Sequence, residues 1–229
     1  MAFQPIVDLH RRTVFAYEAL VRGLHNEPAA EILARVNGQN RYPFDQMCRV
    51  KAIELASLLH MPTYLSINFM PNAVYRAETC IRTTLQVAGW LGFPRERIIF
   101  EITEGEQIVD PDHLREIVRE YKRQGFKTAI DDFGAGYSGL NLLTEFQPDI
   151  IKLDMGLIRH IDRNQVRQAI VRGTLYICRE LGITVIAEGI ETRAELDFLR
   201  DAGIDLFQGY YFARPGFEML PTVSSDSWA

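Results

Sequence analysis

The sequence predicts an α/β fold, a modified TIM-type (β/α)8 barrel in which one strand near the N-terminus runs antiparallel to the others. Short runs of β-branched and aromatic residues alternate with longer stretches of helical period along the 229 residues. This alternation is typical of a parallel sheet closed by helices, and the length fits one such domain. We therefore expect one barrel over residues 1–220 and a polar tail over residues 221–229 that frays.

Eight segments have the length and composition of strands. They are residues 3–7, 14–20, 64–68, 98–102, 127–131, 150–153, 184–187 and 206–207. About five polar residues join the first two segments, too few for a parallel crossover. One of these two strands is therefore expected to run against the rest.

Three of the intervening helices carry clear start and stop signals. Asp110 and Pro111 form a cap and first turn, and Gly125 ends that helix. Thr192 and Glu195 form a capping box for a later helix. The expected buried faces are Leu114, Ile117, Val118 and Tyr121 on the first helix, Val166, Ile170, Ile177 and Leu181 on a second, and Leu196 and Leu199 on the third.

Composition indicates an ordinary globular chain, with 47% hydrophobic and 24% charged residues. No apolar run is long enough to span a bilayer, and residues 1–8 lack the features of a signal peptide. The three cysteines are far apart, which favours reduced thiols in the cytoplasm over disulfides or zinc. The net charge of −5 argues against nucleic-acid polymers as partners. Because the first strand begins at residue 3, we expect an upstream sensor or regulatory domain.

Polar side chains lie at the carboxyl ends of the expected strands, where barrels of this class build their active sites. They are Glu18, Asn68, Glu101, Asp131, Asp132, Lys152, Glu188 and Gln208. Singly, each is better explained as a solvated loop residue or a helix cap. Together, the oxygen-bearing groups would repel one another unless they were neutralised. Hard cations such as Mg²⁺ or Mn²⁺ prefer these ligands, so we expect a divalent metal centre rather than a zinc site.

The adjacent aspartates Asp131 and Asp132 need a local irregularity to reach one site, because neighbouring strand residues point to opposite faces. Gly134 and Gly136 indicate that the strand breaks up there. From the residues alone, Asp132 could equally be the cap of a turn.

In chain order, these residues resemble the EAL-domain family of cyclic-di-GMP phosphodiesterases. The namesake motif stands at Glu18-Ala19-Leu20. Accompanying segments are residues 3–8 (FQPIVD), 67–68 (IN), 101–104 (EITE), 131–134 (DDFG), 151–154 (IKLD), 187–191 (AEGIE) and 208–210 (QGY). The resemblance covers nearly the whole chain. It implies a phosphodiesterase that hydrolyses c-di-GMP to linear pGpG by two-metal activation of water, in bacterial second-messenger signalling.

The resemblance also implies roles for individual residues. One metal would be held by Glu18, Asn68, Glu101 and Asp131, and a second held or oriented by Asp131, Asp132 and Glu188. The catalytic residues would be Glu18, Lys152 and Glu188. Lys152 would position the attacking water or stabilise the phosphate, and Glu188 would be a ligand or a general base. Substrate-binding residues would be Gln4, Arg22 and Gln208. Glu104 would anchor the loop over residues 133–139, in a homodimer that requires Mg²⁺ or Mn²⁺ and is inhibited by Ca²⁺.

Two other functions stay open. The first is a receptor that binds c-di-GMP without turnover, although such receptors typically lack some metal ligands and this chain retains the full set. The second is a metal-dependent barrel enzyme acting on another phosphate ester. Single residues also have simpler interpretations: Gln4 could satisfy backbone groups, Glu104 could be an exposed turn residue, and Asp154 could pair with Lys152.

Overall fold

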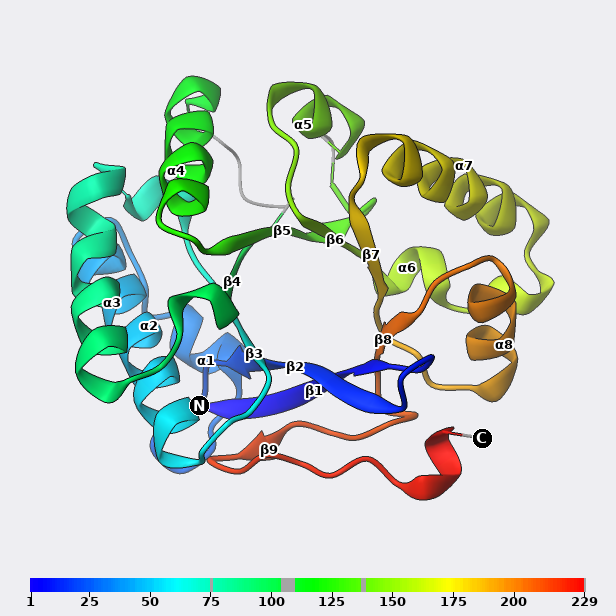
Figure 1. Cartoon of the computed structure of the whole chain (residues 1–229), viewed down its shortest axis with the longest axis horizontal. Coiled ribbons are helices and arrows are strands. Elements are labelled where there is room, and N and C mark those ends of the chain that lie inside the picture. Colours follow the sequence, from blue (N-terminus) through cyan, green and yellow to red (C-terminus); the bar gives the residue numbers. More distant parts are fainter. Residues whose placement is uncertain (75, 104–109, 137–138, 229) are drawn as a thin grey trace.

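A closed ring of strands surrounded by helices forms the centre of the computed structural model, which describes residues 1–74, 76–103, 110–136 and 139–228 (Figure 1). The ring strands are β1 (Ala2–Asp8), β2 (Thr13–Leu20), β3 (Tyr64–Asn68), β4 (Ile98–Thr103), β5 (Lys127–Phe133), β6 (Ile150–Leu153), β7 (Thr184–Ala187) and β8 (Leu206–Gln208). Strands β2 to β8 are parallel neighbours in chain order. The predicted barrel is confirmed.

The first strand closes the ring. β1 lies between β8 and β2 and is antiparallel to both, which confirms the expected reversed strand. A further short strand, β9 (Gly216–Phe217), pairs with Ala2 and Phe3 of β1. The sequence did not indicate β9, because two residues are too few to show a period of two.

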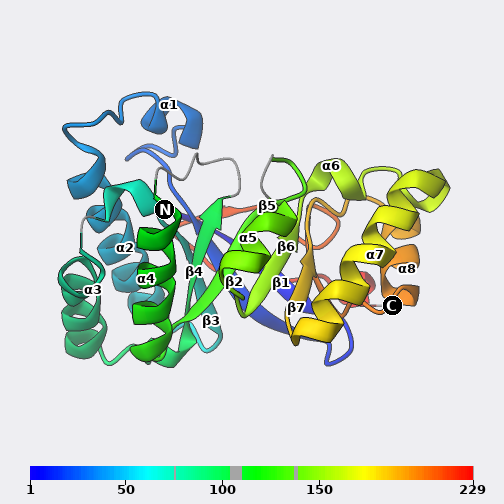
Figure 2. The same cartoon turned by 90° about the horizontal axis from the view of Figure 1, so that it is seen from above.

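Helices surround the barrel. They are α1 (Ala29–Leu33), α2 (Arg41–Leu58), α3 (Ala77–Leu91), α4 (Pro111–Arg123), α5 (Gly139–Glu145), α6 (Met155–Ile158), α7 (Gln165–Leu181) and α8 (Arg193–Asp201). The Asp110 carboxylate accepts the His113 N–H at the start of α4, and the capping box of Thr192 and Glu195 begins α8. Both predicted helix starts are confirmed. Seen from above, α1 lies beyond one end of the barrel (Figure 2). Among the described residues, no helix combines the length and apolarity needed to cross a membrane.

The buried faces of two helices agree with the sequence, and that of a third does not. Leu114, Ile117, Val118 and Tyr121 of α4 and Leu196 and Leu199 of α8 are buried. The face expected on α7 is wrong: Val166 is 68% exposed and Ile170 is 47% exposed. The barrel side of α7 carries Val171, Thr174 and Cys178 instead. Because Thr174 and Cys178 are not strongly apolar, the pattern of apolar residues did not predict that this face is buried.

The C-terminal segment contacts the rest of the chain at some of its residues, although Thr222 and residues 224–226 are exposed. The Tyr17 hydroxyl donates to the Pro221 carbonyl over 3.0 Å, and the Ser227 hydroxyl donates to the Tyr211 carbonyl. Trp228 packs against the main hydrophobic core. Its one large aromatic ring outweighs the polar composition of the segment.

An apolar layer fills the inside of the barrel and supports what lies above it. The layer consists of Ile6, Ala16, Ile99, Ala129, Ile150, Ile186 and Leu206. Each comes from a different strand, and all are almost completely buried. Side chains alternate between the two faces of a strand, so the residues two positions along each strand also point inward. These next residues form the candidate site.

Candidate metal centre

The second inward-facing layer of the barrel is polar. On each parallel strand, the polar residue lies two positions after the residue of the apolar layer. These polar residues are Glu18, Glu101, Asp131, Lys152, Glu188 and Gln208. On the antiparallel β1, the corresponding residue is Gln4, two positions before Ile6. The pairing of Gln4 with Glu18 across β1 and β2 places these two at the same level. The structure therefore brings together most of the residues that the sequence selected. Alternation along each strand points these side chains inward, and closure of the ring brings them close to one another.

Lys152 lies at the centre of this layer and is 1% exposed. Its Nζ lies 2.6 Å from Glu188 Oε1, 2.9 Å from Glu101 Oε2, 2.9 Å from Asp131 Oδ1 and 3.3 Å from Glu18 Oε2. The expected pairing of Lys152 with Asp154 is wrong. β6 ends at Leu153, so Asp154 leaves the strand and caps α6 by accepting the Gly156 N–H over 2.7 Å.

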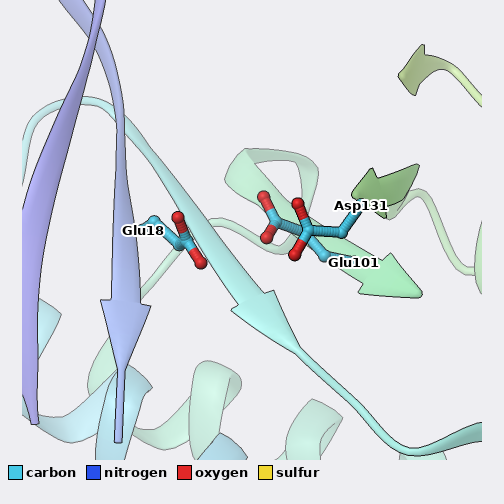
Figure 3. A group of neighbouring side chains, drawn as sticks. All are labelled: Glu18, Glu101 and Asp131. Atoms are coloured by element: carbon cyan, nitrogen blue, oxygen red, sulfur yellow. The ribbon is translucent and has the colours of Figure 1, made fainter. Parts of the chain in front are cut away.

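The carboxylates form two groups that share one residue. Oxygens of Glu18, Glu101 and Asp131 all lie within 4.8 Å of one another, and so do oxygens of Asp131, Asp132 and Glu188. Figure 3 shows Glu18 reaching from β2 toward Glu101 and Asp131 on the opposite side of the group. Either set could hold one cation, and Asp131 belongs to both sets.

A distortion of β5 allows the adjacent Asp131 and Asp132 to reach the same site. The strand continues to Phe133, and its register with β6 shifts between Ile130 and Phe133. Asp132 has a φ of 53°, in the left-handed region that non-glycine residues rarely adopt. The predicted irregularity is confirmed, but it lies within β5, between Ile130 and Phe133, and not at Gly134 and Gly136.

Other polar side chains hold the carboxylates in place. Asn68 Nδ2 donates to Glu18 Oε1 over 2.8 Å, and Gln208 Nε2 donates to Glu18 Oε2 over 2.8 Å. The Ser66 hydroxyl donates to Glu101 Oε1. Ser66 is fully buried on β3, and the sequence analysis missed it. Its position two residues before Asn68, on the same strand face, was the available signal.

The electrostatics favour a bound cation. Burial raises the pKa of Glu101 to about 8, although Lys152 opposes the shift. Burial likewise raises the pKa of Glu188 well above its usual value, and burial together with Asp131 raises the pKa of Asp132 to about 6. Burial lowers the pKa of Lys152, but the surrounding carboxylates outweigh it and raise that pKa well above the ordinary value. One ammonium group therefore does not neutralise the carboxylates around it.

The donor set fits divalent metal ions. Within the described part of the chain, the buried oxygens Asp131 Oδ1 and Gln208 Oε1 have no hydrogen-bond partner, although Asp131 Oδ1 contacts the Lys152 ammonium. The ligand atoms are carboxylate and amide oxygens, which hard cations prefer over softer metals.

Two cavities adjoin the layer. One, of about 280 Å³, is lined by Gln4, Glu18, Asp131, Asp132, Lys152, Asp154, Met155, Glu188, Gly189, Glu191, Gln208, Gly209 and Tyr210. The other, of about 340 Å³, is mainly apolar and reaches Asn68 from the side of α1 and α2. The polar layer is therefore open to a ligand larger than water.

The remaining predicted residues have different outcomes. Gln4 donates from Nε2 to the Ala213 carbonyl over 3.2 Å, which agrees with its interpretation as a residue that satisfies backbone groups, and it also lines the polar cavity, so its role in substrate binding stays a prediction. Arg22 is only half-buried, donates to the Val21 carbonyl and lines neither of these two cavities. Glu104, the expected loop anchor, lies outside the described residues.

Fold and site together define a TIM-type barrel with an acidic, oxygen-rich centre at the carboxyl ends of its strands. The EAL domain family model matches residues 1–215, and the chain belongs to this family. The family predicted from the motifs is confirmed.

Two curated relatives come from Escherichia coli K12. The blue light- and temperature-regulated antirepressor BluF is 34% identical over 97% of this chain and 56% of its own length. Cyclic di-GMP phosphodiesterase PdeR is 36% identical over 66% of this chain and 22% of its own length. The chain thus spans about half the length of BluF and a smaller part of PdeR.

Two solved structures are closely similar. A standalone EAL protein from Vibrio cholerae O395, in its c-di-GMP-bound form, is 57% identical with a TM-score of 0.96, over 99% of this chain and 96% of that chain. The manganese/c-di-GMP complex of Klebsiella pneumoniae BlrP1 is 39% identical with a TM-score of 0.90, over 95% of this chain and 56% of that chain.

Proposed function

We propose that this chain is a metal-dependent phosphodiesterase that hydrolyses c-di-GMP to linear pGpG in bacterial second-messenger signalling. The observation that carries the proposal is the pair of carboxylate groups sharing Asp131 around the buried Lys152. Relatives support the substrate, since the Vibrio cholerae EAL protein and BlrP1 were both solved with c-di-GMP. The naming of PdeR as a phosphodiesterase supports the reaction.

The two carboxylate groups would hold two divalent cations. Glu18, Glu101 and Asp131, with the Asn68 amide oxygen, would hold one, and Asp131, Asp132 and Glu188 would hold or orient the other. Manganese in the BlrP1 complex supports Mn²⁺ or Mg²⁺ as the ions. When bound, such ions lower the pKa of water and stabilise negative charge on the phosphate. Ca²⁺ also accompanies c-di-GMP in a BlrP1 complex. We propose that here it occupies the site but supports little turnover, because it is larger and less strictly coordinated.

The chain's own residues would orient the substrate and stabilise charge. Lys152 carries its positive charge at neutral pH, and its Nζ would stabilise the phosphate as the bond to the ribose 3′-oxygen breaks. Glu188 would bind a cation or accept the proton of the attacking water. Gln4 and Gln208 line the polar cavity and would contact the dinucleotide. Arg22 Nη1 donates to the Val21 carbonyl, and the other N–H donors of the guanidinium would fork onto a phosphate.

Assembly and context are part of the same proposal. Leu140 and Met155 are 55% and 49% exposed, and Met155 also lines the polar cavity, which supports a homodimer contact close to the site. BluF is about twice as long as the matched segment, which supports a sensor domain joined to this barrel. A cytoplasmic location is consistent with three free cysteines.

A receptor is the second candidate, because BluF is named an antirepressor rather than a phosphodiesterase. The intact carboxylate layer favours the enzyme. Incubating the protein with c-di-GMP, or with a nitrophenyl phosphodiester, and Mg²⁺, Mn²⁺ or Ca²⁺ in turn tests both candidates. An enzyme specific for c-di-GMP converts only the dinucleotide, with Mg²⁺ or Mn²⁺. A receptor binds c-di-GMP and converts neither compound, while a general phosphodiesterase converts both.

A further inference from the structure

A buried ion pair on α2 lies behind the β3–β4 side of the metal centre. Arg49 is fully buried, and its Nη2 lies 2.6 Å from Asp45 Oδ2. Arg49 Nη1 also donates to the Tyr121 hydroxyl over 2.7 Å. A buried ion pair is costly to desolvate, and apolar residues of similar volume are often at least as stabilising. Stability alone therefore does not account for this pair.

The Arg49 guanidinium packs on two rings that adjoin predicted metal ligands. Its Cζ lies 5.1 Å from the centre of the Phe69 ring and 5.2 Å from that of Phe100. Phe69 directly follows Asn68, and Phe100 directly precedes Glu101. Adjacent residues of an extended chain point to opposite faces, so the rings pack outward while the two ligands point into the barrel. The guanidinium thus contacts the outer side of both strand ends.

The Asp45 carboxylate holds the backbone beyond β3 directly. Its Oδ1 accepts the Met70 N–H over 2.9 Å. On the other side, the Phe69 N–H donates to the Glu101 carbonyl over 3.0 Å. The two residues after Asn68 are therefore fixed by β4 and by α2, and Asn68 in turn donates to Glu18. Asp45 is 3% exposed, although Asp45 and Met70 both line the apolar cavity beside Asn68.

We propose that Asp45 and Arg49 are positioning residues for Asn68 and Glu101. Asp45 fixes the backbone after β3 through its carboxylate oxygen. Arg49 fixes Asp45 and holds the rings of Phe69 and Phe100 in place. This inference rests on the proposed function, because the residues that are positioned are ligands of the proposed metal centre.

Two double variants test the inference by calorimetric titration with Mn²⁺. Asp45→Asn/Arg49→Met removes both charges but keeps an oxygen that accepts the Met70 N–H. Asp45→Leu/Arg49→Met removes the charges and the acceptor. We expect both variants to lose Mn²⁺ affinity because the Arg49 contacts are gone, and the second, which also lacks the acceptor of the Met70 N–H, to lose more, about tenfold in total, as for other residues that orient metal ligands. Lys152 is unchanged in both, so the charge of the layer stays the same.

A control variant distinguishes the loss of ligand positioning from a general loss of protein stability. Leu199 is fully buried on α8, which lies on the opposite side of the barrel from α2 (Figure 1), so Leu199→Ala should lower the melting temperature and leave Mn²⁺ affinity unchanged. Folded double variants that both bind Mn²⁺ like the wild type overturn the inference. Wild-type protein that binds no Mn²⁺ overturns the proposed function instead.

Amide hydrogen exchange of the wild type gives a second test that needs no variant to fold. If Asp45 links the Met70 amide to the metal ligands, the linkage is reciprocal, and Mn²⁺ should slow exchange at Met70 by about fivefold or more. Equal exchange rates at Met70 with Mn²⁺ and with EDTA, in protein shown by titration to bind Mn²⁺, contradict the linkage.

Discussion

Lys152 Nζ lies 2.9 Å from Glu101 Oε2, and both side chains are 1% exposed at the centre of the barrel. Without a metal ion, this lysine is the cation that the surrounding carboxylates share. In the proposed enzyme, bound metal ions would neutralise these carboxylates and leave the same ammonium group free to act on the substrate phosphate. Replacing Lys152 or one of the carboxylates around it should therefore change catalysis and metal binding in ways that can be measured separately.

Replacing Lys152 should affect chemistry more than binding. We expect Lys152→Met to lower kcat by about 10²- to 10³-fold, the usual loss when one group that stabilises transition-state charge is removed. Binding of c-di-GMP, measured in Ca²⁺ to prevent turnover, should change by less than about tenfold. A proportional loss of binding and kcat would instead assign Lys152 to ground-state binding.

Glu18 should be needed for the metal itself. Glu18→Gln keeps the shape and the hydrogen-bonding capacity of the side chain but removes a charged ligand oxygen. Because losing an ion removes several kcal/mol of transition-state stabilisation, kcat should fall by several orders of magnitude, together with Mn²⁺ affinity. Calorimetry and product assays on the same preparation check this, and unchanged Mn²⁺ affinity would exclude Glu18 as a ligand.

The metal affinity should rise with pH. Glu101 has a pKa of about 8 without metal, so at pH 7 a cation must displace its proton. Since the pKa values of Glu188 and Asp132 are raised as well, the apparent affinity should increase from pH 6 to pH 8, by up to about tenfold per pH unit for each proton that the cation displaces. Mn²⁺ titrations between pH 6 and 9 test the sign, and an affinity that falls with rising pH contradicts the assignment.

The left-handed backbone at Asp132 allows its carboxylate and its conformation to be tested separately. Asp132→Ala and Asp132→Gly both remove the carboxylate, but only glycine tolerates a φ of 53° without strain. The alanine variant should be less stable than the glycine variant by about 1 kcal/mol. Both should lose Mn²⁺ affinity equally if the carboxylate matters. Denaturant unfolding measures the first difference and calorimetry the second.

Arg22 should contribute to substrate binding, with Arg22→Ala raising KM more than it lowers kcat. Its Nη1 donates to the Val21 carbonyl, and the guanidinium carries further N–H donors for a phosphate. A matched comparison is Gln208→Ala, which removes a donor to Glu18 and should therefore lower kcat as well. An unchanged KM for the Arg22 variant would remove it from the substrate site.

The sequence predicted the barrel and the inner layer well because both depend on local period. Glu18, Glu101 and Lys152 each lie two positions after an apolar inward-facing residue, and this spacing can be read from the sequence. The partners of those side chains are not visible in this way. Asp154 was expected beside Lys152, but a strand that ends one residue earlier turns its carboxylate toward the Gly156 N–H.

Other features depend on contacts between distant segments. Ser66 was missed because a serine inside an apolar strand carries no signal until β4 brings Glu101 beside it. The network of Asp45 and Arg49 was missed for the same reason, since an i,i+4 pair on a helix is usually a solvated surface pair. The packing of β3, β4 and α4 over that pair buries it.

The most direct test is a single-turnover reaction with the protein in excess over c-di-GMP, read by chromatography, in Mn²⁺ and in EDTA. We predict complete conversion to pGpG in Mn²⁺ and unchanged c-di-GMP in EDTA, with turnover restored when Mn²⁺ is added back. Glu18→Gln in Mn²⁺ serves as the control for contaminating activity. c-di-GMP that is bound by the wild type yet recovered intact in Mn²⁺ and in Mg²⁺ would contradict this prediction.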